Sequence, residues 1–283
     1  MIYIFISILL FSLNNVLWKQ NLENTPVSSL IAYRAFFTTI LALLYILFFT
    51  DTGNVTHYEF AKITAGSISG VLGLFCMLTA LKHISLQWIG IYNLVGVIFT
   101  ALYLMIFENF DFEESAIGIL TICIGFGFFI FTNTKNSMQI KGKQHMLLLC
   151  MTIFFTVVSL VHWKNLLSEV PPIVIIANQE LIVLITGLFI TLKTVSMPSI
   201  RNIVKTKFSQ VLLMSLVVIG AFSASLLGLK ITDPLVSGLL FLANPLVTIL
   251  FSAYFFKEKV TLKNWIAIAI ICLGAFLLQI KIF

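Results

Sequence analysis

The stretch Trp18-Lys19-Gln20-Asn21-Leu22-Glu23-Asn24-Thr25-Pro26 has a counterpart in Trp163-Lys164-Asn165-Leu166-Leu167-Ser168-Glu169-Val170-Pro171. Tryptophan, lysine and proline recur in the same order at a constant offset of 145 residues. Each stretch closes one apolar segment, and its proline opens the next. This correspondence predicts an internal repeat.

Two further pairs of segments continue the repeat. Lys82 corresponds to Lys230 at an offset of 148, and the run Ile122–Gly125 resembles the run Ile271–Gly274 at an offset of 149. Five apolar segments then fall in each half. Because five is an odd number, the second half enters the membrane from the opposite side, which predicts an inverted-topology repeat. Such repeats are typical of secondary transporters, in which the substrate site lies near the membrane midplane. The alternative is a gene duplication with no role in transport.

Hydropathy predicts ten membrane spans along the chain. Hydrophobic residues make up 60% of the 283 residues and charged residues 10%, against about 45–50% and about 25% in soluble domains. A helix needs roughly 20 apolar residues to cross the hydrocarbon of a bilayer. The predicted spans are 2–18, 27–50, 63–81, 84–107, 115–132, 146–163, 171–192, 208–229, 234–256 and 264–281.

These spans predict an all-α integral membrane protein of ten transmembrane helices in two inverted five-helix repeats. Residues 1–134 form the first repeat, residues 145–283 the second, and residues 135–144 a basic linker. A single chain already contains both halves, so a monomer suffices. The lipid bilayer is its expected surroundings.

The sequence lacks the motifs that would indicate several other protein classes. The net charge of +6 comes without a Lys/Arg-rich aromatic platform, so no nucleic-acid partner is expected. The four cysteines have no CxxC spacing, so no metal is expected. Gly125-Phe126-Gly127 lies inside an apolar span with no strand before it, so it is not a dinucleotide loop. With no catalytic Ser/His/Asp set or paired carboxylates at mid-depth, we expect no enzyme and no cofactor.

Two ionisable residues lie near mid-depth in their predicted spans. At 1.5 Å per helical residue, Arg34 lies about 12 Å beyond Pro26 and Glu180 about 13.5 Å beyond Pro171. A charge at the bilayer centre costs at least about 2.5–3.5 kcal/mol, so such a residue is a functional candidate. In the repeat, Arg34 corresponds to Gln179, the neighbour of Glu180.

Arg34 and Glu180 are therefore the first candidates for substrate binding. The planar guanidinium of Arg34 suits a substrate carboxylate. Glu180 would bind a substrate amine or carry the coupling proton, because arginine does not deprotonate in proteins. The alternatives are a fixed Arg34–Glu180 ion pair that only locks two helices, or an Arg34 side chain that reaches towards the nearer interface.

Amide side chains inside the spans are further candidates, because each offers hydrogen-bond donors and acceptors without a charge. The predicted substrate-binding amides are Asn14, Asn178, Gln179 and Asn244. Pro245 lacks an N–H and is expected to break its helix and free the carbonyl of Phe241. Most such amides make hydrogen bonds between helices, which is the alternative for each of them.

Other recurring side chains predict packing and anchoring. Trp18, Trp88, Trp163 and Trp265 lie near span ends and are expected to anchor at the membrane interface. Gly66 and Gly70 have GxxxG spacing, which predicts a close approach by a neighbouring helix. His162 falls at the end of a span, where a histidine is usually solvated.

The order of several short motifs resembles the EamA-type transporters of the drug/metabolite transporter superfamily, over the whole chain in two copies. The matching positions are Asn14 and Lys19 in the first span, Arg34 in the second, Ala80-Leu81-Lys82 after the third, and Pro245 and Glu258 in the ninth. The tryptophan-glycine start of the first span is absent. The fourth span keeps Glu108, but Val95-Gly96 stands near the place of its proline.

This resemblance implies a ten-helix, multi-pass carrier of the inner cell membrane. Its substrate is expected to be a small organic metabolite, most often an amino acid or related compound that is exported. A nucleotide sugar or other phosphorylated metabolite or drug is the alternative cargo, and a membrane scaffold or integral membrane enzyme is the alternative outside transport. The family places both termini in the cytoplasm, whereas the distribution of Lys and Arg among the connections places them outside.

Overall fold

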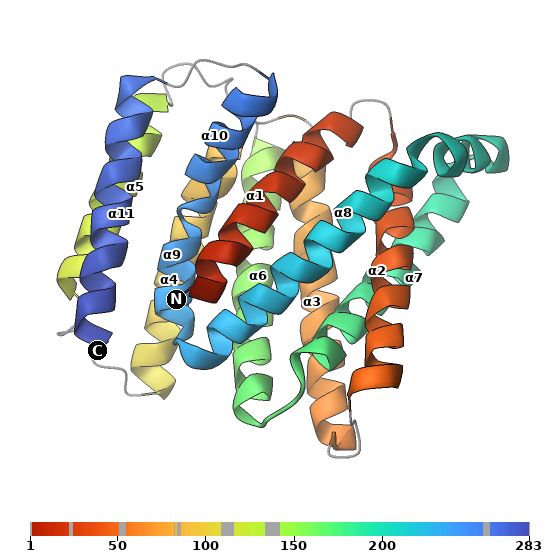
Figure 1. Ribbon diagram of the computed structural model, residues 1–283, viewed down its shortest axis with the longest axis horizontal. Coiled ribbons are helices and arrows are strands. Elements are labelled where there is room, and N and C mark those ends of the chain that lie inside the picture. Colours follow the sequence, from red (N-terminus) through yellow and green to blue (C-terminus); the bar gives the residue numbers. More distant parts are fainter. Residues whose placement is uncertain are drawn as a thin grey trace.

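The computed structural model is built from α-helices, and no strand occurs among the residues that it describes (Figure 1). It describes residues 2–22, 25–50, 55–81, 83, 86–108, 116–133, 142–256 and 261–282. The helices are α1 (Ile2–Leu22), α2 (Val27–Phe49), α3 (His57–Leu81), α4 (Leu86–Phe107), α5 (Ala116–Asn133), α6 (Gly142–Leu167), α7 (Pro172–Thr194), α8 (Met197–Ile231), α9 (Pro234–Phe241), α10 (Asn244–Phe256) and α11 (Leu262–Ile282).

The helices begin where the local sequence satisfies or removes the first free N–H groups. Pro26 precedes α2 and Pro171 precedes α7, where a missing N–H costs nothing. Thr56 and Glu59 form a reciprocal capping box at the start of α3, with each side chain accepting from the other residue's backbone N–H. The carboxylate of Asp233 accepts from the N–H of Val236 and caps α9.

The length of the apolar helices agrees with a membrane protein. Seven helical segments are long and apolar enough to cross a bilayer, with α9 and α10 together forming one of them. The apolar parts of α4, α5 and α11 are shorter. The all-α membrane class is thus confirmed, whereas the count of ten spans and the division at 135–144 stay predictions. Residues 135–141 of that linker lie outside the described residues.

Several helices extend beyond their predicted spans, and α6 and α8 show why. The sixth span was expected to end at residue 163, but α6 continues to Leu167 and stops where Glu169 adopts a left-handed φ of 60°. There the N–H of Val170 donates to the carbonyl of Asn165, as in a Schellman motif. Helix α8 begins at Met197, eleven residues before the predicted span at 208. Charged residues end a hydrophobic span without ending the helix.

The most extensive helix contacts join the first half of the chain to the second. The pairs α2–α7 and α5–α11 each pack along their length, as do α3–α6 and α1–α8, and α5 and α11 run side by side at one edge (Figure 1). The predicted repeat relates α1 to α6, α2 to α7 and α3 to α8. Exchanging each helix for its partner therefore converts the contact α3–α6 into α8–α1, and the contact α3–α7 into α8–α2, and both of these contacts occur. The helix contacts are therefore consistent with two equivalent halves.

Glycines allow the closest of these approaches, and they do so reciprocally at α5–α11. A Cβ on Gly125 would lie 2.9 Å from Cγ1 of Ile271, and a Cβ on Gly274 would lie 2.6 Å from Cγ1 of Ile122. These are the positions that correspond in the runs Ile122–Gly125 and Ile271–Gly274. Each run thus offers its glycine to the isoleucine of the other.

The ninth predicted span is interrupted in its middle. Helix α9 ends at Phe241 and α10 begins at Asn244. At the break, the N–H of Leu242 donates to the carbonyl of Leu239 and that of Ala243 to the carbonyl of Leu240, which are the tighter bonds of a 3₁₀ turn. Because Pro245 has no N–H, the carbonyl of Phe241 has no donor four residues later.

Candidate functional site

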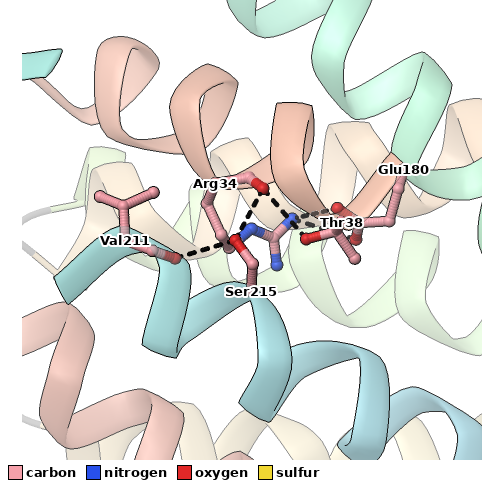
Figure 2. Close-up of polar contacts among 5 residues, drawn as sticks. All are labelled: Arg34, Thr38, Glu180, Val211 and Ser215. Atoms are coloured by element: carbon pink, nitrogen blue, oxygen red, sulfur yellow. Dashed lines mark hydrogen bonds and ion pairs between the residues drawn. The ribbon is translucent and has the colours of Figure 1, made fainter. Parts of the chain in front are cut away.

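Arg34 on α2 and Glu180 on α7 form a buried ion pair where the two helices pack (Figure 2). Nη2 of Arg34 lies 2.8 Å from Oε2 and 3.0 Å from Oε1 of Glu180. Arg34 is 3% exposed and Glu180 is 1% exposed. The guanidinium is therefore enclosed by the protein, and its charge is balanced by a buried carboxylate.

The backbone around Arg34 is fixed by two hydroxyl groups. Oγ1 of Thr38 and Oγ of Ser215 each donate to the carbonyl of Arg34 at 3.0 Å (Figure 2). Ser215 also donates to the carbonyl of Val211 on its own helix, α8. Nε of Arg34 has no hydrogen-bond partner among the described residues. The guanidinium thus keeps an unused donor beside its ion pair.

Trp18 lies against the same arginine and is not an interface anchor, contrary to the expectation from its place near a span end. Its ring centroid is 5.8 Å from Cζ of Arg34, and the residue is 2% exposed. An aromatic face at this distance attracts the guanidinium charge. Trp265 is 51% exposed, and nothing is described of the side chain of Trp88.

Two adjacent amides on α7 face α3. Nδ2 of Asn178 donates to Oγ1 of Thr64 at 3.1 Å. The amide of Gln179 lies directly over Gly70, where an added Cβ would be 2.4 Å from its Nε2. Gly70 therefore serves the close packing that its GxxxG spacing predicted, and the group it admits is a polar one.

Asn244 lies at the helix break and is bonded to α1. Oγ of Ser12 donates to its Oδ1 at 2.6 Å and to its carbonyl at 3.1 Å, and Oγ1 of Thr248 donates to the same Oδ1 at 3.3 Å. Asn14 is 6% exposed, and its Oδ1 has no partner within the described ranges. The candidate amides thus fall into two groups, with Asn178 and Gln179 at α3 and Asn244 at α1.

Sequence reasoning missed several buried polar residues, among them Ser67 on α3 and His162 on α6. Ser67 is fully buried, and His162 is 6% exposed rather than solvated. Oγ of Ser67 and Nε2 of His162 lack a hydrogen-bond partner in the part of the chain that the structure describes. The GxxxG spacing was the one sequence feature that pointed to this place, because Ser67 lies between Gly66 and Gly70 and His162 packs against Gly66.

A second ion pair joins the ends of α4 and α6, outside the buried region. Nζ of Lys164 bonds to Oε1 of Glu108, with the two side chains 39% and 27% exposed. Glu258, the corresponding acid of the second half, lies outside the described residues. No group of three His, Cys, Asp or Glu side chains suited to a metal ion occurs among the residues described.

The profile of the EamA-like transporter family matches residues 1–133 and 143–280. The chain belongs to the EamA-like transporter family. It is accordingly a multi-pass membrane transporter of the drug/metabolite transporter superfamily, which is not a family of enzymes.

One solved structure, described only as "Crystal structure of protein", superposes on the chain with a TM-score of 0.78 and 16% sequence identity. The match covers 99% of this chain and 96% of the other. At this identity the likeness shows a shared fold alone. No curated protein matches the chain.

Proposed function

We propose that this EamA-like protein is a secondary carrier that exports a small organic metabolite, an amino acid or related compound, across the inner cell membrane by alternating access. The observation that carries the proposal is the Arg34–Glu180 ion pair, which is buried inside two apolar helices. Buried charges are expensive within membranes, and an ionisable residue inside a membrane span is a functional candidate by default.

A zwitterionic amino acid matches this pair charge for charge. Its carboxylate would take the place of Glu180 on the guanidinium of Arg34, and its ammonium group would take the place of Arg34 on the carboxylate of Glu180. The free Nε of Arg34 gives a second donor for a bidentate contact with a carboxylate. Substrate binding then replaces the ion pair between Arg34 and Glu180 with two ion pairs between these residues and the substrate. Glu180 is the proposed carrier of any coupling proton.

The amides provide neutral contacts for the rest of the substrate. Asn178 and Gln179 continue α7 beside Glu180, and unpaired acceptor oxygens remain on both of them. Asn14 keeps an unpaired Oδ1 on α1. Asn244 and Pro245 stand at the helix break between α9 and α10, where freed carbonyls in transporters commonly contact substrates or ions.

The proposed movement exchanges two equivalent halves, residues 1–134 and 145–283. Helix contacts that map onto each other under this exchange support it. In an inverted repeat, one arrangement of the halves opens the site to one side of the membrane and its mirror arrangement opens it to the other. A single chain supplies both halves, so we propose a functional monomer.

A phosphorylated cargo is less well matched. Arg34 is the only lysine or arginine in the buried set of the described residues, whereas a nucleotide sugar carries two phosphate charges. Outside transport, a membrane scaffold would tolerate the loss of Arg34 and Glu180 together, and an integral membrane enzyme would form product in detergent solution without a sealed compartment.

Counterflow in proteoliposomes tests the proposal. Vesicles containing the purified protein are preloaded with a mixed pool of unlabelled amino acids, and labelled members of the pool are added outside one at a time. Accumulation of a label establishes a carrier for that substrate, and Arg34→Ala should abolish it. The matched control is Arg201→Ala, at an exposed arginine on α8. If folded protein accumulates no label from this pool, the amino-acid assignment is wrong.

A further inference from the structure

The junction of α3, α6 and α7 collects buried polar side chains around two glycines. His162 on α6 packs against Gly66, with its Cδ2 3.8 Å from the position of a Cβ, and Gln179 on α7 packs against Gly70. Ser67 lies between these glycines on α3. We call Ser67, His162, Asn178 and Gln179 the polar junction.

Each member of the polar junction has a polar atom without a partner. These atoms are Oγ of Ser67, Nε2 of His162, Oδ1 of Asn178 and Oε1 of Gln179, and all four residues are more than nine-tenths buried. Buried polar atoms in folded proteins are nearly always hydrogen-bonded to protein, water or ligand. Four such atoms on the contacting helices α3, α6 and α7 therefore indicate a hydrogen-bonding group from outside the protein.

The repeat relates this junction to the ion pair. Arg34 corresponds to Gln179, and Ser215 corresponds to Ser67 at the offset of 148 that relates Lys82 to Lys230. Ser215 donates to the carbonyl of Arg34, whereas the hydroxyl of Ser67 donates to no described group. One half of the protein thus has a charged contact whose serine hydroxyl is hydrogen-bonded, and the other has a neutral contact whose serine hydroxyl is not.

Helix α7 places the two contacts next to each other. Glu180 faces α2, where it meets Arg34, and the preceding residue, Gln179, faces α3, where it meets Gly70. A ligand whose charged groups replace the ion pair would therefore reach the polar junction with the part that extends from those groups. In an amino acid, that part is the side chain.

We infer that the polar junction binds the substrate's side chain and selects amino acids whose side chain is polar and uncharged, an amide or a hydroxyl. The inference rests on the proposed transport of a zwitterion at Arg34 and Glu180. Amide, hydroxyl and imidazole groups match such a side chain, because each can donate or accept without leaving a buried charge. A site built on hydrogen bonds strongly rejects a ligand of the same shape that lacks them.

The test compares substrates of nearly equal shape in the counterflow assay. L-asparagine and L-leucine share the zwitterion and the branching of the side chain, and differ in hydrogen-bonding capacity, as do L-threonine and L-valine. We expect kcat/KM to favour the polar member of each pair by about tenfold or more. A protein that transports leucine as well as asparagine overturns the side-chain assignment and leaves the carrier proposal standing. Absence of transport for every amino acid removes both.

Two variants locate the selectivity, and a third is the matched control. Ser67→Ala and Gln179→Met should each lower the asparagine-to-leucine ratio severalfold while leucine counterflow continues, which a loss of folding would not produce. Ser69→Ala alters a partly exposed serine on the same helix, bonded to the carbonyl of Ala65, and should leave the ratio unchanged. If Ser67→Ala and Gln179→Met change both substrates equally, the junction holds only water and the inference is wrong.

Discussion

Removing one partner of the buried ion pair should destabilise the protein, and removing both should restore its stability without restoring transport. Two charges about 4 Å apart interact by about 4 kcal/mol at an effective dielectric of about 20. The bonds of 2.8 and 3.0 Å between Arg34 and Glu180, both almost inaccessible, place the pair in this range. Breaking such a pair from one side typically costs about 3–5 kcal/mol.

The experiment is a double-mutant cycle with Arg34→Met, Glu180→Gln and the combination of the two. Glu180→Gln leaves an unbalanced guanidinium, so its free energy of unfolding in detergent micelles should fall by about 3 kcal/mol or more. The double variant has no buried charge and should lie within about 1 kcal/mol of the wild type. None of the three should catalyse counterflow, because the zwitterion needs both charges.

Two results would refute this reasoning. Normal counterflow by the double variant would show that the pair only locks α2 to α7. A free energy of unfolding for Glu180→Gln equal to that of the wild type would show that Arg34 is stabilised by something other than Glu180. Measuring stability and transport on the same preparations separates these two failures.

Three further perturbations test other parts of the structure. Gly274→Ala should lower the free energy of unfolding by about 1–3 kcal/mol through a clash in α5–α11, whereas Gly127→Ala, where a Cβ meets nothing within 4 Å, should have no such effect in the same unfolding assay. Lys164→Glu should impair counterflow and regain it when combined with Glu108→Lys; no recovery in the double variant would argue against a role for their ion pair. Burial raises the pKa of the Asp233 carboxyl, so folding favours its protonated form and stability falls as the pH rises through that pKa. Asp233→Asn should remove this fall from a pH series of unfolding measurements, and an unchanged slope would assign it to another group.

The starts of α2 and α7 could be predicted from the sequence because proline acts locally. Pro26 and Pro171 fix the starts of α2 and α7 by removing a donor, whatever the rest of the fold does. The start of α8 was missed because hydropathy follows the hydrocarbon boundary. Residues such as Arg201 and Lys205 continue the helix outside that boundary.

The sequence was enough to predict the two charged residues of the candidate site, but not the residues that surround them. Depth along a helix was enough to single out Arg34 and Glu180. Nothing in the sequence pairs Gln179 with Gly70, because that contact depends on how α3 lies against α7. The burial of Trp18 was hidden for the same reason, since a position near a span end does not reveal which helices cover it.

The reciprocal contact of Gly125 and Gly274 also has a consequence for synthesis. The two glycines are separated by roughly 150 residues of chain, so at about 5–20 residues per second α5 waits on the order of 10–30 seconds for α11 to emerge from the ribosome. Helix α2 waits about as long for α7, whereas α3 waits roughly half as long for α6. During this interval the nascent half-protein exposes unfilled helix faces to lipid or to the insertion machinery. Its assembly is therefore completed only when α11 has emerged, and neither half is expected to persist as a stable fragment.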